Sequence, residues 1–143
     1  MLLVQSTGLQ FREALKQATP LQLVGVINPL IALMAEELGF KAIYLSGAGV
    51  ANAELGLPDL GLSSLDDVLL SVRRITARCS LPLIVDADTG WGSPLNVERT
   101  FAELSKAGAA GAHIEDQDIS KRCGHRPGKK LVSLEDMVAR VKA

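Results

Sequence analysis

Apolar and polar positions along this chain alternate between short aliphatic runs and longer segments with a helical period. The aliphatic runs lie at 21–27, 42–45, 83–85 and 110–114, and each has the length of a strand. After each run, apolar residues recur every three or four positions, which is the period of a helix with one buried face. The pattern therefore predicts four units in which a strand precedes a helix, and a parallel sheet.

Residues that commonly begin or end helices support these units. Ser64 and Asp67 are spaced as in a capping box, where each side chain binds the backbone N–H group of the other residue. Between the second strand and Ser64 we expect a glycine-rich turn at 46–49 and then a long loop. The predicted helices are 8–18 (ended by Pro20), 30–38 (with Pro29 in the first turn), one from Ser64, one from Asn96 to Gly108, and a last one from Ser133.

Length and composition limit the possible folds and partners. The 143 residues predict one domain spanning 1–143, with fifteen basic and sixteen acidic residues and no basic excess for nucleic acid. No apolar run is long enough to span a membrane, and Met1–Val4 is too short for a signal segment. Cys79 and Cys123 form no disulfide pattern, so we expect a reducing, cytoplasmic setting.

Acidic residues follow the predicted strands at the end where parallel α/β folds place their sites. Asp86 and Asp88 are two positions apart, so both can face one spot, and Glu115 ends the next strand. Together with Asp59, these residues form a cluster of carboxylates without a basic partner. Such a cluster needs a cation, because the carboxylates otherwise repel one another. Oxygen ligands favour Mg²⁺ or Mn²⁺, although each acid taken alone is equally typical of a helix cap or ion pair.

A polar loop after the fourth strand contains the second candidate group. Cys123 has basic residues on both sides, including Lys121, and cations lower the pKa of a thiol toward working pH. Such a thiol can give and take protons, while Gly124 lets a substrate approach the backbone. His125 is either a second acid–base group or a surface residue, and Cys79 is expected to be structural.

Three further features have two interpretations each. The segment 46–49 is either a simple turn or a place where Ser46 and backbone N–H groups bind a carboxylate or phosphate. His113 is either a core residue or a polar group that faces the site. Trp91 either forms a wall of the pocket or only packs.

The chain resembles the isocitrate lyase/phosphoenolpyruvate mutase superfamily, and among its members it is most similar to those that cleave 2-methylisocitrate. The cysteine-containing segment is the specific part, because it distinguishes the lyases from the mutases and decarboxylases. The resemblance extends over the whole chain in one order, and the matching segments are 44–47, 57–61, 85–90, 113–117 and 121–125.

The resemblance implies a (β/α)8 TIM barrel, of which this chain covers roughly the first four βα units. It also implies Mg²⁺-dependent cleavage of a tricarboxylate, 2-methylisocitrate, into pyruvate and succinate during propionate catabolism. The implied metal site comprises Asp86 and Asp88, with Asp59 and Glu115 holding metal-bound waters. The implied substrate site comprises Tyr44, Ser46, Gly47, Ala48, Asp86, Cys123, Gly124 and His125. The implied catalytic residues are Cys123, as proton donor to the succinate carbanion, with Lys121 and His125.

Two departures from the family pattern leave alternatives open. Ala48 stands where the family has glycine, and family members are nearly twice as long. A half-barrel exposes two strand edges, so we expect instability unless the chain forms a homo-oligomer or pairs with a partner. The alternatives are a non-catalytic half-barrel that binds Mg²⁺ or a carboxylate, and a relative of isocitrate lyase or oxaloacetate decarboxylase.

Overall fold

The structure, a computed structural model, describes residues 6–143, so the expectation for Met1–Val4 lies outside the described residues. Its centre is one four-stranded parallel sheet in the order β1-β2-β3-β4. The strands are β1 (Val24–Val26), β2 (Ile43–Leu45), β3 (Leu83–Asp86) and β4 (Gly111–His113). The predicted parallel α/β arrangement is confirmed, although β1 and β4 are shorter than the aliphatic runs 21–27 and 110–114.

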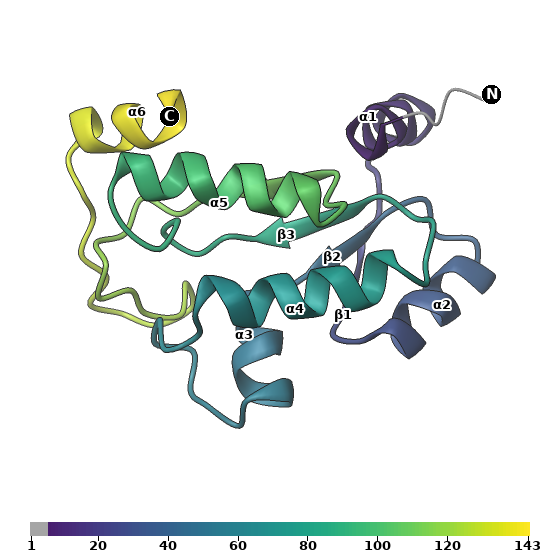
Figure 1. Ribbon diagram of the computed structural model, residues 1–143, viewed down its shortest axis with the longest axis horizontal. Coiled ribbons are helices and arrows are strands. Elements are labelled where there is room, and N and C mark those ends of the chain that lie inside the picture. The colour runs from purple at the N-terminus through teal and green to yellow at the C-terminus, as the bar shows by residue number, and fades with distance from the viewer. Residues whose placement is uncertain (1–5) are drawn as a thin grey trace.

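Helices separate the strands along the chain, as the periodicity predicts (Figure 1). They are α1 (Thr7–Gln17), α2 (Pro29–Glu37), α3 (Gly47–Gly49), a π-helix η1 (Val50–Glu54), α4 (Leu65–Thr76), α5 (Pro94–Lys106) and α6 (Leu134–Lys142). Within residues 6–143, none of these helices has the length and apolar character needed to cross a bilayer.

Two helix starts test the predicted caps, and one differs from the prediction. The capping box before α4 is present, because the Asp67 N–H donates to Ser64 Oγ and the Ser64 N–H donates to Asp67 Oδ2. The prediction that Asn96 begins α5 is wrong. Ser93 is the N-cap, its N–H donates to Asn96 Oδ1 at 3.1 Å, and Pro94 occupies the first turn, where its missing N–H costs nothing.

The segment after β2 also differs from the predicted turn and long loop. Ser46 caps a helical turn, and its hydroxyl accepts a hydrogen bond from the Gly49 N–H at 3.3 Å. The chain then continues into η1 before it becomes irregular. Small residues permit this close winding: a Cβ at Gly49 would lie 2.9 Å from the side chain of Ile27. Glycine at this position therefore reflects packing against the end of β1.

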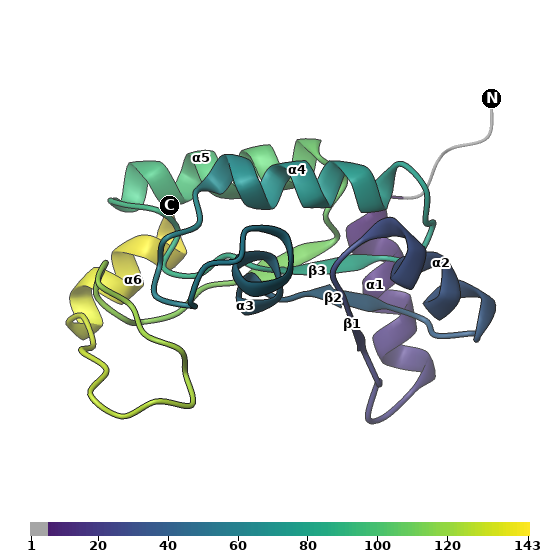
Figure 2. The ribbon, with the colours of Figure 1, turned by 90° about the horizontal axis from the view of Figure 1, so that it is seen from below.

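The two faces of the sheet have different surroundings. Val26, Leu45 and Val85 are paired across the sheet and buried in the apolar core beneath α2, α4 and α5. Alternate positions such as Tyr44 and His113 lie on the other face, where they are partly or largely exposed. Figure 2 shows α4 and α5 side by side over one face of the sheet.

Replacing Ile75 with alanine is expected to lower the free energy of unfolding by about 3 kcal/mol, because the side chain is fully buried in the core. Leu70→Ala is the matched control on the same helix, since Leu70 is 46% exposed. Urea denaturation of both variants measures the difference. Equal destabilisation by the two substitutions would contradict the burial pattern of α4.

Candidate functional site

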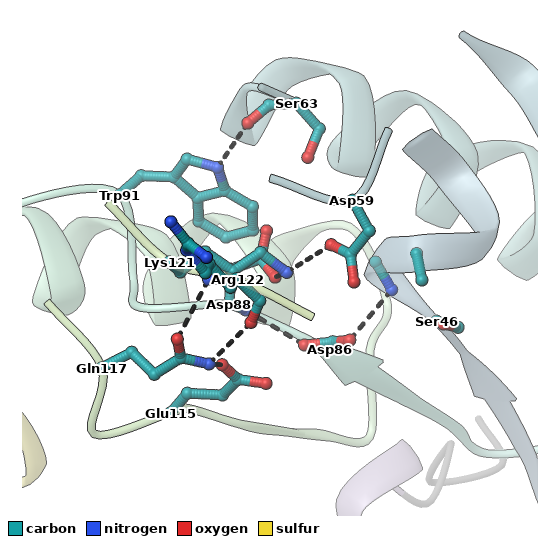
Figure 3. Close-up of polar contacts among 12 residues, drawn as sticks. Ser46, Asp59, Ser63, Asp86, Asp88, Trp91, Glu115, Gln117, Lys121 and Arg122 are labelled. Atoms are coloured by element: carbon teal, nitrogen blue, oxygen red, sulfur yellow. Dashed lines mark hydrogen bonds and ion pairs between the residues drawn. The ribbon is translucent and has the colours of Figure 1, made fainter. Parts of the chain in front are cut away.

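Two buried aspartates stand where β3 ends. Asp86 is the last residue of β3, and Asp88 lies in the turn that follows, with φ of 45°. This left-handed conformation is one that aspartate adopts more readily than most residues. The Asp86 carboxylate accepts hydrogen bonds from the Gly47 N–H at 3.0 Å and from the Asp88 N–H at 3.2 Å. Backbone groups from two strand ends therefore fix its orientation (Figure 3).

Gly47 leaves open a space on which both carboxylates converge. A Cβ at this position would lie 3.1 Å from Asp86 Oδ2 and 3.2 Å from Asp88 Oδ1. Asp88 Oδ1 is buried, and among the described residues it has an ion-pair partner but no hydrogen bond of regular geometry. Two converging carboxylate oxygens are a donor set that suits a hard cation such as Mg²⁺.

Lys121 provides the basic partner that the sequence interpretation did not assign to these acids. Its ammonium lies 2.6 Å from Asp59 Oδ1 and also contacts Asp88 Oδ1, and the residue is only 5% exposed. Burial alone would lower the pKa of Lys121, but its contacts with the two aspartates raise that pKa above its usual value. Burial raises the pKa of Asp88, and Lys121 opposes this effect. The lysine is therefore charged and compensates the buried carboxylates.

The predicted metal ligands are only partly assembled. Within residues 6–143, no three Asp, Glu, His or Cys side chains gather closely enough to hold one ion. Asp59 and Asp88 contact Lys121 instead, and Glu115 accepts a hydrogen bond from Gln117 Nε2 at 2.5 Å. Because Mg²⁺ usually keeps several waters, one or two direct carboxylates are enough. Asp86 and Asp88 fit that requirement.

The loop that contains Cys123 is closed at its base by backbone hydrogen bonds. The Asp118 N–H donates to the Lys130 carbonyl, the Val132 N–H donates to the Asp116 carbonyl, and Gln117 forms an antiparallel bridge with Leu131. These contacts hold the two ends of the segment 118–130 together. The ion pairs of Lys121 with Asp59 and Asp88 then hold this part of the loop next to the site.

Cys123 begins a tight turn, which determines where the neighbouring residues lie. The Arg126 N–H donates to the Cys123 carbonyl at 2.9 Å, so Gly124 and His125 form the tip. Cys123 is half-buried, whereas His125 is exposed. The structure therefore supports a partly enclosed thiol and leaves His125 at the surface of the described chain.

One cavity brings together three of the residues that the sequence predicts separately. Its volume is about 220 Å³, and its lining includes Cys123, Ala48 and Asp59. Asn52 and Arg126 also line it; sequence reasoning missed Asn52 and included Arg126 only among the basic residues beside Cys123. A second cavity, of about 480 Å³, includes Gly124, Glu115 and Gln117 in its lining. His125 lines neither cavity.

His113 faces the site rather than the core, which resolves its two interpretations. Its ring stacks on Tyr44 with centroids 5.5 Å apart, and the Tyr44 hydroxyl lies 2.6 Å from His113 Nε2. The same nitrogen lies 3.9 Å from Asp86 Oδ1. Burial, and then the charge of Asp86, raise the pKa of Tyr44 above its usual value. Trp91 packs instead, donating from Nε1 to the Ser63 carbonyl at 2.9 Å.

Gln117 connects Glu115 to the Cys123 loop, and sequence reasoning did not single it out. It is only 3% exposed and hydrogen-bonds both Glu115 and the backbone of Arg122. The available signal was its position two residues after Glu115, since alternate residues of an extended segment face the same side. An uncharged amide in a polar loop gave no stronger indication.

Comparisons with known proteins agree with the family resemblance. The family model of phosphoenolpyruvate phosphomutase matches residues 11–143. The chain is 58% identical to 2-methylisocitrate lyase of Shewanella oneidensis over 141 residues, covering 99% of this chain and 48% of that protein. It is 60% identical to 2-methylisocitrate lyase of Escherichia coli over 141 residues, covering 98% and 48%. The chain thus spans about half the length of these curated relatives.

Solved structures give the same picture. Oxaloacetate acetylhydrolase in complex with 3,3-difluorooxalacetate matches with a TM-score of 0.87 and 40% identity, over 96% of this chain and 47% of that one. Phosphonopyruvate hydrolase in complex with oxalate and Mg²⁺ matches with a TM-score of 0.75 and 28% identity, over 96% and 46%. The four-stranded sheet therefore corresponds to about half of these structures, which belong to the TIM-barrel type.

Gly47→Ala is expected to weaken Mg²⁺ binding by about tenfold or more, because the added methyl group would displace the Asp86 and Asp88 carboxylates. Isothermal titration of the full-length protein with Mg²⁺ measures the affinity. Gly25→Ala is the control, since a Cβ there meets no described atom within 4 Å. Unchanged Mg²⁺ affinity in Gly47→Ala would rule out this space as the metal position.

Lys121→Met is expected to lower the free energy of unfolding by about 3 kcal/mol in metal-free buffer, because Asp59 and Asp88 lose their buried counter-charge. Added Mg²⁺ should recover more stability in this variant than in the wild type. Denaturant unfolding with and without Mg²⁺ measures both effects, and Lys130→Met, at an exposed position, is the control. A variant as stable as the wild type without metal would contradict the charge balance described for Lys121.

Proposed function

This chain belongs to the phosphoenolpyruvate phosphomutase family, and we propose that it is part of a Mg²⁺-dependent lyase that cleaves 2-methylisocitrate into pyruvate and succinate. The identity of about 60% to proteins named 2-methylisocitrate lyase supports this choice within the family. Because the chain covers about half of those relatives, the proposed activity is that of a full-length protein.

The observation that carries the proposal is the shared cavity of Cys123, Ala48 and Asp59. It gives a half-buried thiol access to the same space as one of the carboxylates and the turn that follows β2. A lyase that protonates carbon needs such an arrangement, since the proton donor must reach the substrate while the substrate is held near the cation.

Asp86 and Asp88 are the residues that would hold Mg²⁺ directly, with Asp59 and Glu115 binding its waters. When bound, the ion would supply electrostatic stabilisation of the negative charge that develops on oxygen. The structure of phosphonopyruvate hydrolase in complex with oxalate and Mg²⁺ supports the choice of Mg²⁺ as the ion. Lys121 has to yield at least part of its contact with Asp88 to such an ion, because both are cations that compete for Asp88 Oδ1.

The proposed reaction breaks one carbon–carbon bond and moves two protons. The substrate hydroxyl gives its proton to a carboxylate of the site, the carbon that carried the hydroxyl becomes the ketone carbon of pyruvate, and the bonding electron pair stays on the succinate carbon. The Cys123 thiol then donates its proton to that carbon, which completes succinate. The thiol is suited to this step because it is half-buried and its residue lines the cavity together with Asp59.

Binding of the pyruvate carboxylate would use the turn formed by Ser46, Gly47 and Ala48. The Gly47 N–H already donates to Asp86, and the Ser46 oxygen already accepts from the Gly49 N–H. The Ser46 hydroxyl hydrogen and the Ala48 backbone remain as the groups that we assign to the carboxylate. Cationic groups for the remaining carboxylates of a tricarboxylate are available on the Cys123 loop, where Arg126 lines the cavity.

Cys123→Ser in the full-length protein is expected to reduce methylisocitrate cleavage at least about a hundredfold, because serine is a far weaker acid at neutral pH. Pyruvate release measures turnover, and Mg²⁺ titration should give unchanged affinity. Cys79→Ala is the matched control, since Cys79 is buried away from the cavity and contacts the Ala32 carbonyl.

Three outcomes would contradict the proposal. Wild-type turnover by Cys123→Ser would remove the thiol from the reaction. Faster turnover of isocitrate or oxaloacetate than of methylisocitrate by the wild-type protein would favour another activity in the family. Mg²⁺ binding without turnover of any of the three would favour the non-catalytic alternative.

A further inference from the structure

We propose that Gln117 is the positioning residue of the Cys123 loop. Its two hydrogen bonds to the backbone of Arg122 hold the Cys123 thiol in a fixed position relative to the Glu115 carboxylate. This inference rests on the proposed role of Cys123 as proton donor. Gln117 itself makes no contact with the thiol, so its effect passes through the main chain.

The side-chain amide of Gln117 makes three hydrogen bonds, which use both N–H donors and the carbonyl oxygen. Its Oε1 accepts from the Arg122 N–H at 3.0 Å, and its Nε2 donates to the Arg122 carbonyl at 2.9 Å. The other Nε2 hydrogen goes to Glu115 Oε2 at 2.5 Å. Since a carboxylate only accepts, the amide nitrogen has to face Glu115, and this fixes which way the amide points.

Holding both backbone groups of Arg122 fixes the peptide planes on either side of it. The N–H lies in the plane shared with Lys121, and the carbonyl lies in the plane that contains the Cα of Cys123. A side chain that binds both groups therefore limits rotation about the Arg122 backbone. Lys121 is already fixed by its ion pairs, so the next residue, Cys123, starts from a defined position.

Gln117 can serve as an anchor because its own position is fixed by two other segments. Its backbone pairs with Leu131 in an antiparallel bridge, and its carbonyl accepts a hydrogen bond from Arg140 Nη1 of α6 at 2.9 Å. The side chain is 3% exposed, so water does not compete effectively for its hydrogen bonds. Figure 3 shows Gln117 between Glu115 and the Arg122 backbone.

The principal test is Gln117→Glu in the full-length protein. The variant has nearly the same shape, but a carboxylate places acceptors against Glu115 and the Arg122 carbonyl, so the two-point contact is lost. We expect kcat for methylisocitrate cleavage to fall about tenfold or more, with a much smaller change in KM. Cys123 should also react faster with iodoacetamide, as measured by peptide mass spectrometry, while buried Cys79 serves as the internal reference.

Gln22→Glu makes the same change at an exposed position and should leave both measurements unchanged. A merely structural role for Gln117 would lower the stability of Gln117→Glu but leave kcat and the alkylation rate of the folded enzyme at wild-type values. That result would overturn the inference.

Amide hydrogen exchange in the wild-type protein provides a test that needs no variant. The Arg122 N–H donates to Gln117, whereas the structure gives no acceptor among residues 6–143 for the Gly124 N–H. We expect the Arg122 amide to exchange more slowly than that of Gly124, and equal rates would overturn the inference. Exchange and alkylation need no substrate, so they test the contact even if methylisocitrate is not cleaved and the proposed function fails.

Discussion

The compensation of buried negative charge is the constraint on which the site depends. Asp86 and Asp88 are buried at the end of β3, and carboxylates out of water are costly unless cations or hydrogen bonds balance them. Lys121 meets that need for Asp88 and Asp59, although it comes from a loop far along the chain. The position of the Cys123 loop is therefore coupled to the charge of these aspartates, because Lys121 belongs to the loop and pairs with Asp59 and Asp88.

That coupling explains why the buried aspartates and the Cys123 loop occupy one place in the fold. Parallel strands bring their carboxyl ends to one edge, so residues after β2, β3 and β4 meet although they are distant in sequence. Asp86 receives the Gly47 N–H from the turn after β2, and Gln117 beyond β4 holds the backbone next to Cys123. Gly47 after β2 is thus a partner of Asp86 at the end of β3, and Lys121 after β4 is a partner of Asp88 after β3.

The sequence allowed much of this fold to be predicted because the signals are local and periodic. The four strands, the Ser64 capping box and the acidic residues at strand ends all follow from spacing along the chain. The errors have two different causes. Ser93 rather than Asn96 begins α5 for a local reason, since Pro94 occupies the first turn and Asn96 binds back to the Ser93 N–H. Lys121 was not assigned to the acids because that outcome depends on which distant segments come together in space. Gln117 escaped notice for the same reason.

The alternation of side chains along the strands links the apolar core to the candidate site. Val85 faces the helices, while its neighbour Asp86 faces the opposite side of the sheet together with Tyr44 and His113. A shift of register by one residue would bury Asp86 in the apolar core and expose Val85. Packing beneath α4 and α5 therefore also fixes the direction of the carboxylate, so the aliphatic residues of β3 determine the geometry of a site that they do not touch.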